Sequence, residues 1–267
     1  MRDIDFGKTA EDYARHRAGF PPELFRRLRA FGVGLPGQRL LDIGAGTGAL
    51  ARGFAARGSQ ALALDRSGAL LRTARSLARR EHVGLEPVRA VAEHLPFPRD
   101  HFDVVSAGQC WHWFHRPRAA AEAHRVLKPD GKLVIAHFDW LPLPGSVVEA
   151  TEELIRAYNP AWSDLHVLKL SGGTGIYRDW LGDVALAGFT DIESFSFDVD
   201  ALYTHEAWRG RIRASAGVAA AGLPPATIAA FDADLARLLQ ERFPDEPLHA
   251  PHRVFAVVCR KPADPTP

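Results

Sequence analysis

The sequence contains little cysteine. Only two cysteines, Cys110 and Cys259, occur among 267 residues. They are far apart in the sequence, and neither belongs to a Cys-x-x-Cys pair, so the sequence supports neither a zinc site nor a redox dithiol. We therefore expect two buried free thiols, as in a protein of a reducing compartment, and no bound metal.

Long apolar runs and an excess of charge are also missing. No apolar stretch approaches the ~20 residues that a membrane-spanning helix needs, and the N-terminus lacks the apolar core of a signal peptide. We therefore expect a cytoplasmic protein without a membrane partner. Lys and Arg number 33 against 32 Asp and Glu, whereas proteins that bind nucleic-acid phosphates usually carry a basic excess. The densest basic run, residues 72–80, has the spacing of a solvated helix face, so a nucleic-acid partner is not expected.

Apolar runs of strand length alternate with longer helical stretches along the first half of the chain. This order predicts an α/β fold with a doubly wound, seven-stranded, mostly parallel sheet of the Rossmann-like kind. The predicted strands cover residues 39–43, 60–64, 85–91, 102–107, 132–138, 189–199 and 252–260. The helices expected between the first five strands cover residues 49–57, 67–80 and 116–127, and a turn is expected at 128–131.

The pattern changes after Trp140. An irregular loop is expected at residues 159–176, and helices at residues 147–158, 177–187, 205–221 and 225–243. The simplest organisation is a single domain, residues 1–267, whose cofactor-binding core covers about 36–140. A helical cap would be formed by about 1–35, 141–188 and 204–250.

A glycine-rich turn follows the first predicted strand, where residues 40–48 read LLDIGAGTG. Three glycines at alternate positions let the backbone turn tightly and approach a ligand closely, and ligands of such sheets bind at the carboxyl ends of the strands. A dinucleotide fingerprint has its third glycine one residue later. Asp42 would also repel a pyrophosphate, whereas it would favour a cationic amino-acid ligand such as S-adenosylmethionine.

Asp65 ends the second predicted strand. A carboxylate at that place can accept hydrogen bonds from both hydroxyls of a ribose. This would suit either adenosyl cofactor, so Asp65 supports the fold more than the choice between S-adenosylmethionine and a nicotinamide dinucleotide.

Five motifs in this order resemble those of class I S-adenosylmethionine-dependent methyltransferases. Residues 40–48 are similar to the first motif of that family, and Asp65 matches its ribose-binding acid. The other three matches are AEHLPF at residues 92–97, FDVV at 102–105 and RVLKPDGKL at 125–133. The resemblance covers about residues 10–140.

The resemblance implies where the cofactor would bind. The glycine turn would pass under the methionine moiety, the second strand would end at the ribose, residues 92–97 would hold the adenine, and the position after the fourth strand would lie near the transferable methyl group. The candidate residues of these four places are Asp42, Gly44, Ala45, Gly46, Gly48, Asp65, Arg66, Ala92, Glu93 and Gln109.

The N-terminal segment resembles a narrower group. Residues 13–21, YARHRAGFP, are similar to the Tyr-x-x-x-Arg-x-x-Tyr-Pro opening of methyltransferases akin to the trans-aconitate enzyme. By that resemblance Tyr13 and Arg17, one helical turn apart, would cover the carboxylate of the cofactor. Phe20 replaces the usual tyrosine, so its hydroxyl contact is lost. A surface helix with aromatic packing is the alternative.

An aromatic cluster follows the fourth strand, where residues 109–115 read QCWHWFH. The family often has AFHWFD here, and His115 replaces the acid. We expect Trp111 and His112 to face the methyl acceptor and the next two aromatics to pack. For His112 the alternative is a histidine bonded to a backbone carbonyl.

Methyl transfer is a direct displacement, for which a general base is optional. If the acceptor is a hydroxyl or a ring nitrogen, His112 or His137 would take its proton, because histidine ordinarily titrates near neutrality. Trp140 would either line the acceptor pocket or belong to the core of the cap.

The sequence thus predicts methyl transfer from S-adenosylmethionine to the oxygen, nitrogen or carbon of a small molecule. A cofactor-binding protein that does not methylate and, less favoured, a nicotinamide-dependent oxidoreductase stay open. A nucleic-acid methyltransferase is disfavoured further, because the Asn/Asp-Pro-Pro-Tyr loop of such enzymes is missing after the fourth strand. The sequence does not determine the oligomeric state.

Overall fold

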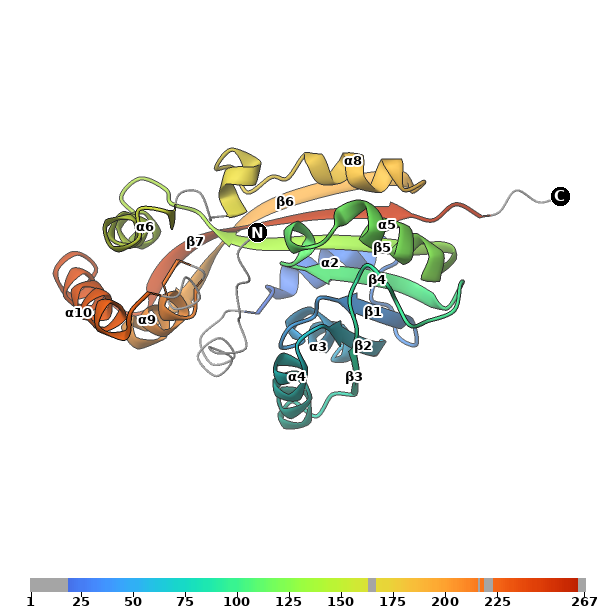
Figure 1. The fold of residues 1–267 in the computed structure, drawn as a ribbon, viewed down its shortest axis with the longest axis horizontal. Coiled ribbons are helices and arrows are strands. Elements are labelled where there is room, and N and C mark those ends of the chain that lie inside the picture. The colour runs from blue at the N-terminus through green and yellow to red at the C-terminus, as the bar shows by residue number, and fades with distance from the viewer. Residues whose placement is uncertain (1–18, 163–166, 216, 219–222, 264–267) are drawn as a thin grey trace. The chain divides into compact units, whose positions relative to one another are not determined.

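A seven-stranded sheet organises the computed structural model, which describes residues 19–162, 167–215, 217–218 and 223–263 (Figure 1). The strand order is β3-β2-β1-β4-β5-β7-β6. This confirms the predicted Rossmann-like methyltransferase fold. The strands are β1 (Arg39–Ile43), β2 (Gln60–Asp65), β3 (Leu85–Arg89), β4 (Phe102–Gly108), β5 (Leu127–Trp140), β6 (Thr190–Tyr203) and β7 (Leu248–Arg260).

The first five strands pair in parallel. β1 lies between β2 and β4, β2 also pairs with β3, and β4 also pairs with β5. The strand order therefore reverses between β1 and β4, which makes the carboxyl end of these two strands the place where such sheets bind ligands. Leu40, Leu41 and Ile43 of β1 are fully buried, as expected for a parallel strand covered on both faces.

The α-helices follow the predicted order. They are α2 (Pro22–Ala30), α3 (Ala49–Ala55), α4 (Gly68–Arg80), α5 (Arg116–Val126), α6 (Val147–Tyr158), α8 (Asp179–Leu186), α9 (His205–Arg213) and α10 (Pro225–Arg242). Ser67 caps α4, because its Oγ accepts a hydrogen bond from the Leu70 backbone N–H at 3.4 Å. Two short 3₁₀ helices, η2 (Trp111–Trp113) and η3 (Val167–Ser171), complete the described helices.

The predicted turn at residues 128–131 lies inside β5, which begins at Leu127 instead of residue 132. The pairing of β5 with β4 shifts register between Phe102 and Val104, and Asp130 has a left-handed backbone with φ of +63°. Gly131 allows this course, because a Cβ there would lie 2.8 Å from the carbonyl oxygen of Lys128. The residues that ordinarily form a turn here form a bulged start of the strand.

Other predicted bounds are also wrong. β3 ends at Arg89 instead of residue 91, and α3 ends at Ala55 instead of residue 57. β6 and β7 are longer than the predicted runs, and α9 ends at Arg213 instead of residue 221.

The described residues fall into two compact units. The core unit comprises 19–138, 177–196 and 255–263, and the second unit comprises the described parts of 139–176 and 197–254. Helix α8, which we assigned to the cap, thus belongs to the core unit. The single-domain organisation and the bounds of the cap stay predictions.

Each unit has its own aromatic core. In the core unit Trp111, Tyr177 and Trp180 are fully buried, and the rings of Tyr177 and Trp180 stack with centroids 4.2 Å apart. In the second unit the rings of Trp140 and Trp208 lie 5.8 Å apart. Within the described ranges, no helix combines the length and hydropathy needed to cross a membrane.

Replacing Phe54→Ala should destabilise the core unit. Phe54 is 1% exposed, its ring meets that of Phe25 edge-on at 5.2 Å, and a Cβ at Gly34 would lie 2.6 Å from it. Loss of such a ring lowers the free energy of unfolding by about 3–5 kcal/mol, measurable by urea denaturation. Leu186→Ala, at a side chain 92% exposed, should change it by no more than about 0.5 kcal/mol. Equal midpoints for the two variants would contradict this packing.

Candidate cofactor site

The turn after β1 contains three glycines in the left-handed region, with φ of +64° at Gly44, +57° at Gly46 and +75° at Gly48. Glycine adopts these angles without steric cost. The chain itself crowds Gly44, because a Cβ there would lie 2.7 Å from the Phe114 ring and 2.8 Å from Cys110 Sγ. At Gly46 a Cβ would meet nothing within 4 Å among the described residues. Gly44 is therefore required for packing, whereas the described residues leave space beside the backbone of Gly46.

Asp65 holds this turn to the end of β2. Its Oδ2 accepts a hydrogen bond from the Gly46 N–H and its Oδ1 one from the Ser67 N–H, both at 2.8 Å. A carboxylate can accept about four hydrogen bonds, so Asp65, 8% exposed, keeps capacity for hydroxyl groups of a ligand. Ala45 also lies in the turn, where its N–H donates to the Leu64 carbonyl at 2.9 Å. The neighbouring Arg66 is exposed.

Asp42 lies beneath the turn and is 1% exposed. The register of β1 and β4 places it opposite Ser106, whose hydroxyl donates to Asp42 Oδ1 at 2.8 Å. Burial, with a smaller contribution from the charge of Asp65, raises the pKa of Asp42 to about 7, although hydrogen bonds from Ser106 and the Ala51 backbone lower it. Asp42 therefore exchanges its proton near neutral pH.

Ser106 is not among the residues that the sequence predicted for this site. A polar residue inside the apolar run of β4 was the available signal, but its partner depends on the pairing of two strands.

The contribution of Asp42 to the stability of the protein should fall as the pH rises from about 4 to about 7. In this window the folded chain keeps a proton on Asp42 that the unfolded chain, with the ordinary pKa of 3.8, has released. Because the folded state then binds more protons, raising the pH favours unfolding. The effect should amount to a few kcal/mol, since one pKa unit corresponds to about 1.4 kcal/mol.

Asp42→Asn should remove this dependence while keeping an acceptor for Ser106. Urea denaturation of both proteins at several pH values measures it. The variant should gain stability relative to the wild type as the pH rises, up to about 7. A difference in unfolding free energy between variant and wild type that stays constant with pH would contradict the raised pKa of Asp42.

The segment predicted to hold the adenine is linked to the loop after β4. Ala92 is buried, and Glu93 Oε1 accepts a hydrogen bond from the His115 backbone N–H at 2.8 Å. The sequence did not predict this link, because the two residues belong to different connections.

Gln109 directly follows β4, on the other side of the strand-order reversal from Gly44. Its backbone is left-handed, with φ of +61°. Its side-chain Nε2 donates to the Phe138 carbonyl at 2.9 Å, and its N–H donates to the Ala136 carbonyl at 2.8 Å. Both bonds fix Gln109 against β5. Because β4 and β1 are neighbouring strands, Gln109 and the glycine turn follow adjacent strands at the same edge of the sheet.

Trp111 is placed as a packing residue. Its ring is fully buried, and its Nε1 donates to Asp183 Oδ2 at 3.0 Å, which also binds Arg116 at 3.1 Å. An indole buried in this way packs η2 against α8. Its burial does not favour the predicted contact with a substrate, which stays a prediction.

The structure brings the two candidate bases together. The ring centroids of His112, in η2, and His137, in β5, lie 5.3 Å apart. His137 is 2% exposed and lies 5.0 Å from the Tyr177 ring and 5.6 Å from the Trp180 ring. His112 is only half-buried. Of the two, His112 is therefore the more accessible to an acceptor.

Trp140 belongs to the core of the second unit. Its Nε1 donates to Glu152 Oε1 at 2.7 Å, and the guanidinium of Arg211 lies 4.6 Å from its ring. These contacts agree with a core residue, and its predicted contact with a substrate is untested. Tyr13 and Arg17 lie outside the described residues.

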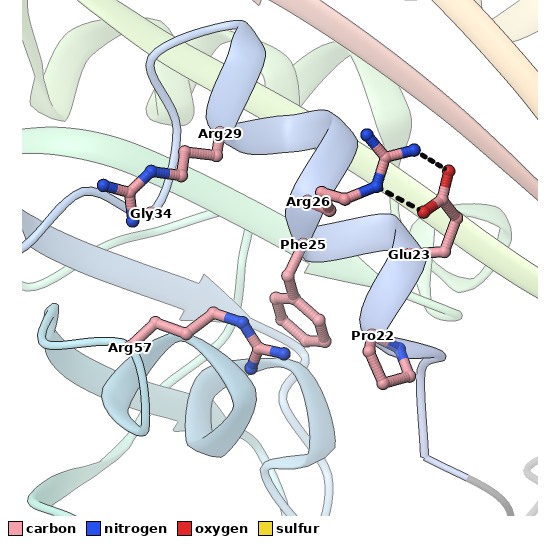
Figure 2. Close-up of a pocket in the computed structure, with 7 residues that line it drawn as sticks. All are labelled: Pro22, Glu23, Phe25, Arg26, Arg29, Gly34 and Arg57. Carbon is pink, nitrogen blue, oxygen red and sulfur yellow. Dashed lines mark hydrogen bonds and ion pairs between the residues drawn. The ribbon is translucent and has the colours of Figure 1, made fainter.

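A cavity of about 330 Å³ lies elsewhere in the core unit. Figure 2 shows Arg26 paired with Glu23 at its rim and Arg57 above the Phe25 ring, 4.1 Å from its centroid. The lining comes from three segments: α2, the loop before β1 and the residues after α3. The loop before β1 leads into the amino end of that strand, whereas the glycine turn follows its carboxyl end. This cavity is therefore not part of the glycine turn. Its lining residues are Pro22, Glu23, Phe25, Arg26, Arg29, Gly34 and Arg57.

Metal ligands do not gather in the part of the chain that the structure describes. No three His, Cys, Asp or Glu side chains there lie close enough together to hold an ion.

Comparison with known proteins assigns the family. A family profile described as a methyltransferase domain matches residues 41–135. The ubiquinone/menaquinone biosynthesis C-methyltransferase of Bordetella avium is 39% identical over 212 residues, which cover 70% of this chain and 78% of that protein. The chain belongs to the class I S-adenosylmethionine-dependent methyltransferases. The predicted family, with S-adenosylmethionine as its cofactor, is thus confirmed.

Other relatives of this methyltransferase are less complete. An uncharacterised methyltransferase of Mycobacterium tuberculosis is 35% identical over 130 residues, so the chain spans about half of that relative (50%) and matches it over 49% of its own length. A solved structure from Anaeromyxobacter dehalogenans, proposed to be a type II methyltransferase, is 24% identical with a TM-score of 0.67. The comparison covers 93% of this chain and 99% of that one and shows the shared fold. The relation to the trans-aconitate enzyme stays a prediction.

Proposed function

We propose that this methyltransferase transfers a methyl group from S-adenosylmethionine to a small-molecule acceptor by direct displacement. The turn at the strand-order reversal is the observation that carries the proposal. There the open backbone of Gly46 is tied to Asp65, and the buried Asp42 lies beneath.

These residues fit a cationic adenosyl amino acid. Gly46 would let the methionine moiety approach the backbone, and Asp65 would accept the ribose hydroxyls on its remaining lone pairs. Ala92 and Glu93 would meet the adenine. A cation near the turn would favour the ionised form of Asp42, because opposite charge offsets the cost of burying a carboxylate.

S-adenosylmethionine supplies a methyl group on a positively charged sulfur when it is bound. The residues of this chain would then act mainly by orientation, which can contribute about 7–11 kcal/mol to lowering a barrier. His112 would accept the proton of a hydroxyl or ring-nitrogen acceptor, with His137 beside it. A carboxylate acceptor would need no such base.

A small-molecule acceptor is supported by the Bordetella relative, whose name assigns it to quinone biosynthesis. The near-balanced charge of the chain also supports a small acceptor over a nucleic acid.

The function can be tested by incubating the full chain with methyl-labelled S-adenosylmethionine and a small-molecule library or cell extract. Mass spectrometry should find a labelled product and an equal amount of S-adenosylhomocysteine. Binding of the cofactor without a product from any extract would instead favour a member of the fold that does not methylate. No binding would contradict the cofactor assignment.

Asp65→Ala should weaken the binding of S-adenosylhomocysteine by at least about tenfold in titration calorimetry, because it removes the ribose acceptor and loosens the Gly46 turn. Glu86→Ala is the matched control, since Glu86 is an exposed acid on β3 of the same unit. Unchanged affinity in the Asp65 variant would remove the assignment of that residue.

His112→Ala should lower turnover by about 10²-fold or more if His112 takes the proton, with cofactor affinity nearly unchanged. The neighbouring exposed His115 is the control, because His115→Ala keeps the backbone N–H that binds Glu93. Initial rates with the identified acceptor and calorimetry with S-adenosylhomocysteine measure the two effects. Wild-type turnover in the His112 variant would show that this histidine is structural.

A further inference from the structure

The segment at residues 92–97 is not fixed by the hydrogen bonds of the sheet. β3 ends at Arg89, and a tight turn follows, closed by an isolated bridge between Val91 and His94. Pro96 and Pro98 have no backbone N–H, so this stretch cannot form a regular ladder with a neighbouring strand. The polar backbone groups of the segment therefore need partners other than the sheet.

Two side chains of α5 supply these partners. Glu122 Oε2 accepts a hydrogen bond from the Leu95 N–H at 2.7 Å. Arg125 Nη2 donates to the Leu95 carbonyl at 2.9 Å, and Arg125 Nη1 donates to the Phe97 carbonyl at 2.8 Å. Three backbone groups of the segment are thus bound by two residues one helical turn apart.

The same two side chains also bind each other. Arg125 donates from Nε to Glu122 Oε1 at 2.7 Å and from Nη2 to Glu122 Oε2 at 2.8 Å. This bidentate pair is mostly buried, with 27% of the Arg125 and 18% of the Glu122 side chain exposed. The pairing lowers the pKa of Glu122 and raises that of Arg125, so both stay charged at neutral pH.

The geometry requires arginine. Its planar guanidinium presents donors in a fixed fork, which here reaches one carboxylate and two carbonyl oxygens at once. A lysine ammonium would keep the charge, but it is a point donor that cannot span these acceptors. Lysine would therefore leave at least one segment carbonyl without its partner.

We infer that Glu122 and Arg125 are positioning residues for the cofactor: they fix residues 92–97 and thereby set recognition of the adenine ring. The inference rests on the proposed function, in which Ala92 and Glu93 meet the adenine. Neither Glu122 nor Arg125 itself touches the cofactor in this account.

The test compares two ligands that differ only in the base, S-adenosylhomocysteine and S-inosylhomocysteine, by calorimetry on the full chain. The wild type should prefer the adenosyl ligand. Arg125→Lys should weaken binding of the adenosyl ligand by about tenfold, because one or two of the hydrogen bonds that fix the segment are lost. It should weaken binding of the inosyl ligand much less. Glu122→Gln keeps the shape and an acceptor for the Leu95 N–H, and should shift the preference in the same direction.

Arg118→Lys is the matched control, since Arg118 is an exposed arginine of the same helix, and it should leave both affinities unchanged. Thermal melting shows whether each variant is folded at the assay temperature. If the Arg125→Lys variant is not folded, the binding ratio of the Glu122→Gln variant tests the inference. Hydrogen exchange of the peptide covering residues 91–99 should rise in the positioning variants.

The outcomes separate the two proposals. A folded variant with faster exchange in this peptide but an unchanged adenosyl-to-inosyl ratio would overturn the inference, because the pair would then be merely structural. Equal binding of both ligands by the wild type would overturn it as well. A wild type that binds neither ligand would contradict the proposed function itself.

Discussion

The carboxylate of Asp65 binds two backbone N–H groups from different connections of the sheet, that of Gly46 after β1 and that of Ser67 before α4. This places one negative charge beside the glycine turn, and the buried Asp42 lies beneath it. The two acids are unfavourable neighbours, because the charge of Asp65 helps to raise the pKa of Asp42. A cationic ligand would relieve this repulsion, and a pyrophosphate would increase it. In the proposed function, this charge arrangement favours an adenosyl amino acid over a dinucleotide.

The loops that surround the turn are fixed by bonds from side chains to backbone. Glu93 binds the loop after β4, Gln109 binds β5, and Arg125 binds the segment at residues 92–97. Such bonds replace the sheet ladder at the carboxyl ends of the strands, where the backbone is irregular. Because orientation supplies most of the help in a displacement reaction, these loops need fixed positions more than they need an acid or a base.

Local signals predicted much of the fold. β1 and α6 have the predicted bounds, and Ser67 caps α4 as expected, because apolar periodicity and capping depend on neighbouring residues. The start of β5 lies five residues before the predicted one, since the course of its irregular first residues depends on pairing with β4.

The motifs placed the glycine turn and Asp65 correctly at the end of neighbouring strands, but they did not show what each residue contacts. Gly44, for example, is required by its packing against Phe114 and Cys110. The burial of Trp111 depends on Asp183 of α8, far along the chain. Arg125 is the first residue of one of the five motifs, yet the partners of the Glu122–Arg125 pair become visible only once α5 lies beside the segment at residues 92–97.

Titration calorimetry of the full chain with S-adenosylhomocysteine and, separately, with NAD at neutral pH tests the central claim most directly. The charge arrangement at the turn predicts saturable one-to-one binding of S-adenosylhomocysteine and no measurable binding of NAD. Tighter binding of NAD would contradict the account.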